Sequence, residues 1–211
     1  MKILISLALV LFSTTARATF IYMDSDSAST TNNSGRATVD LSGTLHPNPS
    51  WAPALPGSEW ISYGPTGDRD DPGFFTPPDG TVVVFTTNFV LSGAITGASL
   101  RVMADDSTSV ILNGHTLIGP DQRGATCYQA PVGCLNKTEG LFNFDILGLY
   151  LVDGTNTLSF GVIPWEGSSF GLDFAGTVDD ATATPEPTTL ALIAGGLIGL
   201  ASRWKATRRR P

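Results

Sequence analysis

Hydrophobic and polar residues alternate with a period of two along much of this chain, between clusters of turn-forming residues. Successive side chains of a β-strand point to opposite faces, so each alternating run predicts a strand with one buried face. In the run Thr81–Leu91, the residues that share a face are Val83, Phe85, Phe89 and Leu91. The other runs are Leu100–Ala104, Phe142–Ile146, Leu158–Val162 and Phe170–Phe174.

Turn signals separate these runs and indicate the fold class. Asn113-Gly114 favours a type I′ hairpin turn, and Asp153-Gly154 marks another turn. Between the two ends of the chain, no segment keeps the 3.6-residue period of a helix. We therefore predict an all-β fold, a single antiparallel β-sandwich of eight to ten strands around one core. The predicted core contains Phe85, Val102, Leu112, Phe144, Leu158 and Phe174.

The first 18 residues have the organisation of a secretory signal peptide. Lys2 gives a charged start, Ile3–Phe12 is a short apolar run, and Ala16-Arg17-Ala18 is a small-x-small cleavage site. The mature chain is predicted to begin at Thr19. We expect the β-sandwich to occupy residues 19–178, followed by a linker over 179–184.

The C-terminus combines a helix breaker, an apolar run and a basic end. Pro185-Glu186-Pro187 precedes the apolar run Thr188–Ser202, and Arg208, Arg209 and Arg210 follow it. Proline suits the first position of a helix, so a transmembrane helix is predicted over about 188–207. The apolar run alone would span about 22 Å, less than a hydrocarbon core of roughly 30 Å, so this span is marginal.

This arrangement over residues 185–211 resembles the PEP-CTERM sorting signal of Gram-negative, polysaccharide-producing bacteria. The resemblance implies that a membrane-embedded exosortase recognises Pro185-Glu186-Pro187 and cuts near it. The protein would then be tethered to the inner membrane only transiently, before release to the cell surface or the extracellular matrix. The alternative is a permanent C-terminal anchor. In both cases the arginine cluster stays cytoplasmic and the body lies outside.

Without its two ends the chain is strongly acidic. Residues 19–184 contain 18 acidic and 5 basic residues, which gives a net charge of 5 − 18 = −13. Nucleic acid is excluded as a partner because no basic surface is available for its phosphates. The acidity keeps an exported protein soluble and favours divalent cations.

The only two cysteines, Cys127 and Cys134, are predicted to form a disulfide. An even number of closely spaced cysteines in an exported chain favours this pairing. Two thiols without nearby histidines do not make a zinc site, and six intervening residues are not the spacing of a redox motif.

Two further stretches, Ala104–Leu117 and Phe144–Val162, resemble the galactose-binding-like jelly roll of sugar-binding domains and many exported bacterial proteins. The resemblance implies a hairpin in the first stretch and a strand entered through a turn in the second. Because the matching residues are turn and core formers, it implies a fold more than a ligand. They are Asp106, Val110, Leu112, Asn113, Gly114, Gly154, Asn156 and Leu158.

Two groups of residues are candidates for ligand binding. Trp51, Tyr63 and Trp165 could stack on sugar rings, since flat aromatic rings bury apolar C–H faces; the alternative is packing in the core and at strand ends. Asp68, Asp70 and Asp71 form an oxygen-rich cluster that could bind a structural Ca²⁺; the alternative is a solvated acidic loop. No other cofactor is indicated.

Enzymatic motifs are absent from the sequence. His46 and His115 are the only histidines, and neither a G-x-S-x-G elbow nor an H-E-x-x-H helix is present. We therefore expect a non-enzymatic surface or matrix protein whose β-sandwich is an interaction or structural domain. The alternatives are a carbohydrate-binding module for exopolysaccharide and a secreted hydrolase. The hydrolase would need a histidine, or paired carboxylates such as Asp68 and Glu59, in one pocket.

Overall fold

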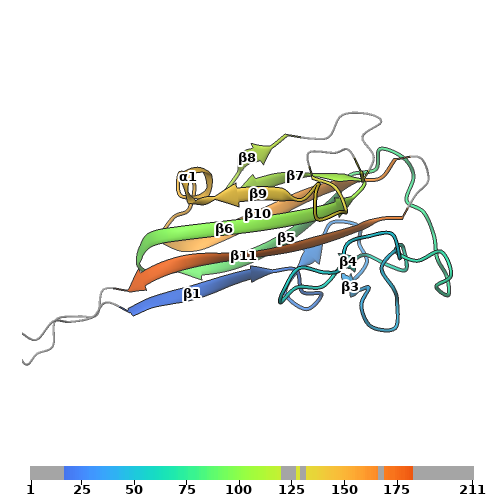
Figure 1. The fold of residues 1–211 in the computed structure, drawn as a ribbon, viewed down its shortest axis with the longest axis horizontal. Helices are drawn as coiled ribbons and strands as arrows, with labels where there is room; N and C mark the ends of the chain where they lie inside the picture. Colours follow the sequence, from blue (N-terminus) through green and yellow to red (C-terminus); the bar gives the residue numbers. More distant parts are fainter. Residues whose placement is uncertain (1–16, 120–126, 129–131, 166–168, 183–211) are drawn as a thin grey trace, which may run out of the picture. The chain divides into compact units, whose positions relative to one another are not determined.

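The computed structural model describes residues 17–119, 127–128, 132–165 and 169–182 (Figure 1). Residues 1–16 of the predicted signal peptide and the predicted span over about 188–207 lie outside this part of the chain, as does the end of the chain with Pro185, Glu186, Pro187, Arg208, Arg209 and Arg210. Among the described residues, no helix has the length and apolar character needed to cross a membrane.

The described residues form two facing β-sheets, which confirms the predicted all-β antiparallel sandwich. One sheet has six strands in the order β3-β4-β11-β6-β9, with β1 also paired to β11, and the other has five in the order β2-β5-β10-β7-β8. The elements are β1 (Arg17–Asp24), β2 (Thr31–Asn32), β3 (Val39–Asp40), β4 (Ile61–Ser62), β5 (Val83–Leu91), β6 (Ala94–Asp105), β7 (Ser107–Leu112), β8 (His115–Ile118), β9 (Gly140–Asn143), α1 (Phe144–Leu147), β10 (Gly154–Ile163) and β11 (Gly171–Thr182).

The main core lies between the sheets and follows the period-two pattern. In β5, all the apolar residues predicted to share one face are buried. Phe160 of β10 and Phe174 of β11 stack across the sandwich with ring centroids 4.4 Å apart, and both are fully buried. The core prediction is thereby confirmed for Phe85, Val102, Leu112, Leu158 and Phe174.

The same prediction is wrong for Phe144. Strand β9 ends at Asn143, and the chain turns into α1, where the Gly148 N–H donates to the Phe144 carbonyl. The helical turn breaks the alternation, so Phe144 is 38 % exposed and Leu147 takes the inward position instead. Phe142, the preceding residue of the run, is buried as predicted.

A second hydrophobic cluster lies on the outer face of the six-stranded sheet, whereas the sequence pattern predicts a single core. Met103 of β6 is fully buried there, on the opposite face from Val102 and Ala104. The segments before β4 cover this face. The predicted disulfide between Cys127 and Cys134 is present, and both cysteines belong to the same cluster. Other members of the cluster are Leu41, Trp51, Ala52, Leu55 and Trp60.

Strand β11 continues into the predicted linker over 179–184. Residues up to Ala181 pair with β6, with a register shift between Asp179 and Asp180. Asp180 is buried, and its carboxylate accepts hydrogen bonds from the backbone N–H and the hydroxyl of Ser92. The stretch is polar, but hydrogen bonding holds it in the sheet, so the domain does not end at residue 178. Residues 183–184 lie outside the described part.

The two stretches that resemble a galactose-binding-like domain come together in the five-stranded sheet. Asn113 and Gly114 both have positive φ, +50° and +81°, as the type I′ turn between β7 and β8 requires. Leu112 of β7 faces Leu158 of β10, and the Asn113 amide donates to the Asn156 side-chain oxygen at 2.7 Å. These residues therefore form turns and core.

Candidate functional site

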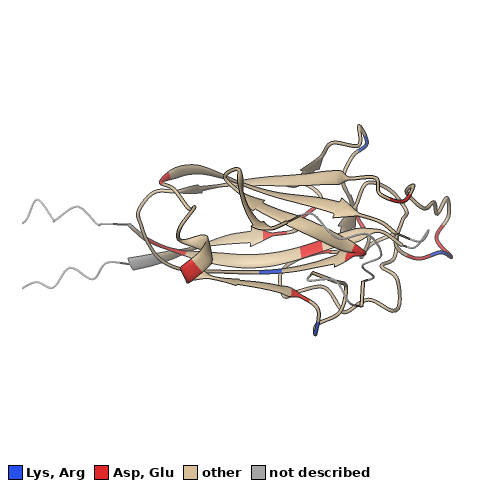
Figure 2. Cartoon of the chain, turned by 90° about the horizontal axis from the view of Figure 1, so that it is seen from above, with Lys and Arg blue, Asp and Glu red and all other residues tan. Residues whose placement is uncertain are grey.

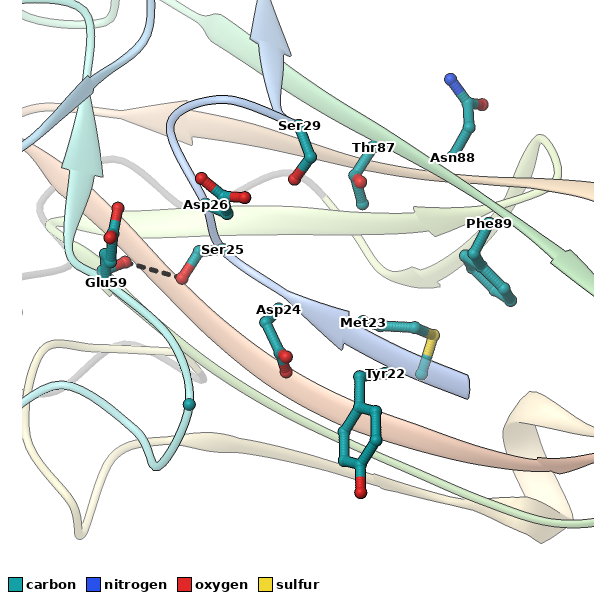
Figure 3. A pocket seen from close by; sticks show the side chains of 11 residues that line it. Tyr22, Met23, Asp24, Ser25, Asp26, Ser29, Glu59, Thr87, Asn88 and Phe89 are labelled. Carbon is teal, nitrogen blue, oxygen red and sulfur yellow. Dashed lines mark hydrogen bonds between the residues drawn. The ribbon is translucent and has the colours of Figure 1, made fainter. Parts of the chain in front are cut away.

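A cleft of about 470 Å³ opens at one edge of the sandwich, between β1 and β5 (Figure 3). Strand β1 supplies Tyr22, Met23 and Asp24, and β5 supplies Thr87, Asn88 and Phe89. The neighbouring strand β2 pairs with β5 only at Phe85 and Thr86, which leaves this part of the edge accessible. The loops after β1 and before β4 complete the wall.

The alternation of side chains along β1 gives the cleft an apolar part and an aromatic rim. Met23 is buried and lines the cleft beside Phe89 of β5 (Figure 3). Tyr22 points the other way and is 67 % exposed. Phe20, two residues earlier on the same strand, is also exposed. Exposed rings of this kind can pack on the C–H face of a ligand.

Hydrogen bonds fix the loop after β1 against the segment before β4. The Ser25 N–H donates to the Phe174 carbonyl at 2.8 Å, and the Glu59 N–H donates to the Ser25 carbonyl at 2.9 Å. The Ser25 hydroxyl lies within hydrogen-bond distance of the Glu59 carbonyl and of the Asp173 carboxylate. Glu59 is thereby positioned at the cleft although it is 34 residues from Ser25 in the sequence.

Asp173 of β11 supports this wall from beneath. Its carboxylate is buried and accepts hydrogen bonds from the Leu55 N–H at 2.8 Å and from the hydroxyls of Ser25 and Ser58. Burial raises the pKa of Asp173 to about 6, against the opposing effect of these three donors.

Acidic groups dominate the polar part of the cleft. Asp24, Asp26 and Glu59 line it, and none of its lining residues is Lys or Arg. The Glu59 Oε2 atom is buried and has no hydrogen-bond partner among the described residues. Burial also raises the pKa of Asp24, although a backbone hydrogen bond from Gly176 opposes the shift. A ligand with hydrogen-bond donors would bind the accessible oxygens of these carboxylates.

The aromatic residues predicted to bind sugar lie elsewhere, and two of the three are buried. The Trp51 ring packs against Trp60 at 4.3 Å, and its N–H donates to the Asp105 carboxylate at 2.6 Å. Tyr63 packs edge-on against two phenylalanine rings of the core. The stacking prediction is therefore wrong for Trp51 and Tyr63, which pack as the alternative expects. Trp165 is half-buried beside Gly80.

The predicted calcium cluster does not assemble. No group of three or more acidic, histidine or cysteine side chains within the described ranges is arranged to hold a metal ion. Asp71 instead binds His46, whose Nδ1 lies 2.6 Å from the Asp71 carboxylate and whose backbone N–H donates to it. Asp68 accepts a hydrogen bond from the Asp70 N–H within the same loop.

The groups named for the hydrolase alternative do not meet in this cleft. His46 is held by Asp71, and His115 stacks on Tyr150 with ring centroids 4.4 Å apart. Glu59 lines the cleft, whereas Asp68 does not. No sequence motif marks Tyr22, Asp24 or Asp26; the signal for them is the alternation of aromatic and apolar residues just after the predicted signal peptide.

Comparison with solved structures finds low similarity to carbohydrate-binding modules. A family 35 carbohydrate-binding module from Clostridium thermocellum matches with a TM-score of 0.39 and 11 % identity, over 74 % of this chain and 97 % of that chain. A CBM35 from Paenibacillus barcinonensis matches with a TM-score of 0.36 and 14 % identity, over 78 % of this chain and 99 % of that one. No curated protein matches this chain.

The C-terminal segment gives the informative match. Residues 183–210 match the family model described as the PEP-CTERM protein-sorting motif. The match includes Pro185-Glu186-Pro187, the apolar run and the arginine cluster, and it begins one residue after β11 ends. The chain therefore carries a PEP-CTERM protein-sorting motif directly after its β-sandwich, as its C-terminal sequence predicts.

Proposed function

We propose that this protein is an exported, non-enzymatic surface or matrix protein that an exosortase processes at its C-terminus. The observation that carries the proposal is the sorting motif over residues 183–210. A predicted signal peptide at residues 1–18 is consistent with export. In this proposal the β-sandwich is the cargo, and the inner membrane holds the chain only until the tail is removed.

The composition of the body supports an exported interaction domain. Acidic residues are spread along the described body, and basic residues are few (Figure 2). A strongly acidic surface keeps a protein soluble and separate from other polyanions. A disulfide stabilises a domain that works outside the reducing cytosol.

Replacing Pro185-Glu186-Pro187 by three alanines tests the sorting function. At 22.2 kDa over 211 residues, removal of residues 185–211 lowers the mass by about 3 kDa. We expect wild-type cells to release the shorter form and the variant to keep the longer form in the membrane fraction. Deleting the exosortase should have the same effect, and a matched Asp145→Asn change on the body should have none. An intact C-terminus in the final surface pool of wild-type cells would show that the tail is a permanent anchor.

We also propose that the body is a galactose-binding-like jelly roll. A second proposed function of the body is carbohydrate binding in the cleft. It is supported by an exposed ring at Tyr22, apolar Met23 and Phe89, and several polar acceptors in one cleft. Sugars have both hydroxyl donors and apolar C–H faces, so they suit a lining of this kind.

Binding of the processed protein to exopolysaccharide from its own host tests the second function. Loss of a ring contact is worth roughly 0.5–1.5 kcal/mol, so Tyr22→Ala should weaken binding about two- to tenfold at unchanged thermal stability. Tyr128 is also exposed but does not line the cleft, so Tyr128→Ala is the matched control. If both variants changed binding equally, the cleft would not be the binding site.

A further inference from the structure

We infer that the cleft between β1 and β5 selects a saccharide with protonated amino groups, a cationic amino sugar, over neutral or anionic sugars. This inference rests on the proposed carbohydrate binding and adds a ligand class to it. Three features of the cleft support it: three carboxylate side chains with no Lys or Arg among the lining residues, a Glu59 carboxylate with one buried oxygen that has no donor among the described residues, and an apolar side with an aromatic rim.

No ion pair among the described residues neutralises the negative charge of the cleft. Asp24, Asp26 and Glu59 reach it from the end of β1, the following loop and the segment before β4. The ion pairs of the described residues, His46–Asp71 and Arg101–Glu139, both lie outside it. Low-dielectric walls strengthen the field of such charges, so the cleft attracts cations and repels uronates, sulfates and phosphates.

Glu59 supplies the most specific contact. Its backbone is fixed by hydrogen bonds to Ser25, and its Oε2 atom is buried without a donor among the described residues. Because Oε2 is inaccessible, a ligand in the cleft reaches this carboxylate through its other oxygen, and a charged N–H donor there compensates the carboxylate better than a neutral hydroxyl does. An ammonium group on the ligand meets this need, and it carries three donors for the neighbouring carboxylates.

The remainder of the lining favours a sugar ring over a bare cation. In Figure 3 the acidic side chains stand toward one end of the cleft, and Met23 and Phe89 stand toward the other. A metal ion would need several oxygen ligands around one point, and the described residues do not form such a group. An amino sugar can place its amine at the acidic end and its C–H face against the apolar side.

Isothermal titration of the processed protein with four tetrasaccharides tests the inference. The probes are a β-1,4-linked glucosamine tetramer, its fully N-acetylated form, cellotetraose and a tetrameric uronate. Measurements at about pH 5.5 keep the amines protonated and ordinary carboxyl groups ionised. We expect the glucosamine tetramer to bind at least about tenfold more tightly than each of the others, as a charge-assisted contact would require.

Two charge variants and one aromatic variant test whether the glucosamine tetramer binds in the cleft. Glu59→Gln keeps the shape of the side chain and should weaken binding of the glucosamine tetramer about tenfold, because the charge-assisted contact is lost. Asp145→Asn removes the same charge from an exposed position on α1 and should change binding less than about twofold. If Glu59→Gln unfolds the protein, Tyr22→Ala, at an exposed position, still tests whether the sugar lies in the cleft, and the comparison of the four probes on the wild type still tests the selection.

The outcomes separate this inference from the function on which it rests. The neutral probes and the glucosamine tetramer could bind equally tightly, with binding of each weakened by Tyr22→Ala. This result would support carbohydrate binding in the cleft and overturn the selection for amines. Equal effects of Glu59→Gln and Asp145→Asn would also overturn it, because attraction would then come from the acidic body as a whole. No binding to any probe or to the host polysaccharide would overturn both.

Discussion

The stability of the β-sandwich should depend on pH through Asp173, which lies beneath the wall of the cleft. Its carboxylate is buried, and the cost of burying a charge raises its pKa from the ordinary 3.8 to about 6. Three hydrogen-bond donors act in the opposite direction because they favour the charged form. The prediction therefore tests which of the two effects is larger.

The sign and size of the effect follow from the two pKa values. Between about 3.8 and about 6, the folded protein keeps the Asp173 proton and the unfolded chain releases it. The stabilisation is thus fully present below about pH 3.8 and is lost as pH rises through about 6. At about 1.4 kcal/mol for each pH unit, the free energy of unfolding should fall by about 3 kcal/mol over this range.

Urea unfolding at a series of pH values, with Asp173→Asn as the comparison, measures this contribution. The amide does not titrate, so the difference in unfolding free energy between wild type and variant should decrease by about 3 kcal/mol from pH 4 to pH 7. Asp145→Asn, at an exposed position, controls for the change in net charge. A difference that stays constant, or that increases with pH, would refute the reasoning and show that the three donors outweigh burial.

Further predictions concern the core and the disulfide. Phe174→Ala should lower the free energy of unfolding by about 3–5 kcal/mol, because the side chain is fully buried against Phe160. Phe144→Ala should cost about 1 kcal/mol or less by the same urea assay, because that residue is 38 % exposed; a larger loss would place it in the core after all. Replacing Cys127 and Cys134 by serine should cost about 2.5 kcal/mol, the loop-closure entropy of about eight residues, and an unchanged unfolding midpoint would contradict this.

The sequence predicts the strands best where both alternation and a turn define them. Strands β5, β10 and β11 have inward residues that repeat every second position, and the Asn113-Gly114 turn sets the hairpin of β7 and β8. At Phe144 the apolar pattern of a strand continues, although the backbone has turned into α1. Alternation alone does not distinguish these two conformations over so few residues.

The residues that form the cleft could not be predicted as a group, since long-range pairing brings them together. Tyr22 and Phe89 approach from different sheets, and Glu59 is fixed by its bonds to Ser25. Trp51 is instead predicted to bind sugar and is buried, because a tryptophan suits either a sugar-binding surface or a core. Its burial depends on Gly171, where an added Cβ would lie 2.7 Å from the Trp51 ring.

The direct passage from β11 into the sorting motif has a mechanical consequence. Strand β11 pairs with β6 from Gly171 to Ala181, and the motif begins at residue 183. A pull on the C-terminus that is directed along β11 would load the inter-strand hydrogen bonds of that strand in shear, many at once. Peeling, in which bonds break one at a time, would require a force across the strand. Under the proposed function, the β-sandwich would then resist tension while its tail is held in the membrane.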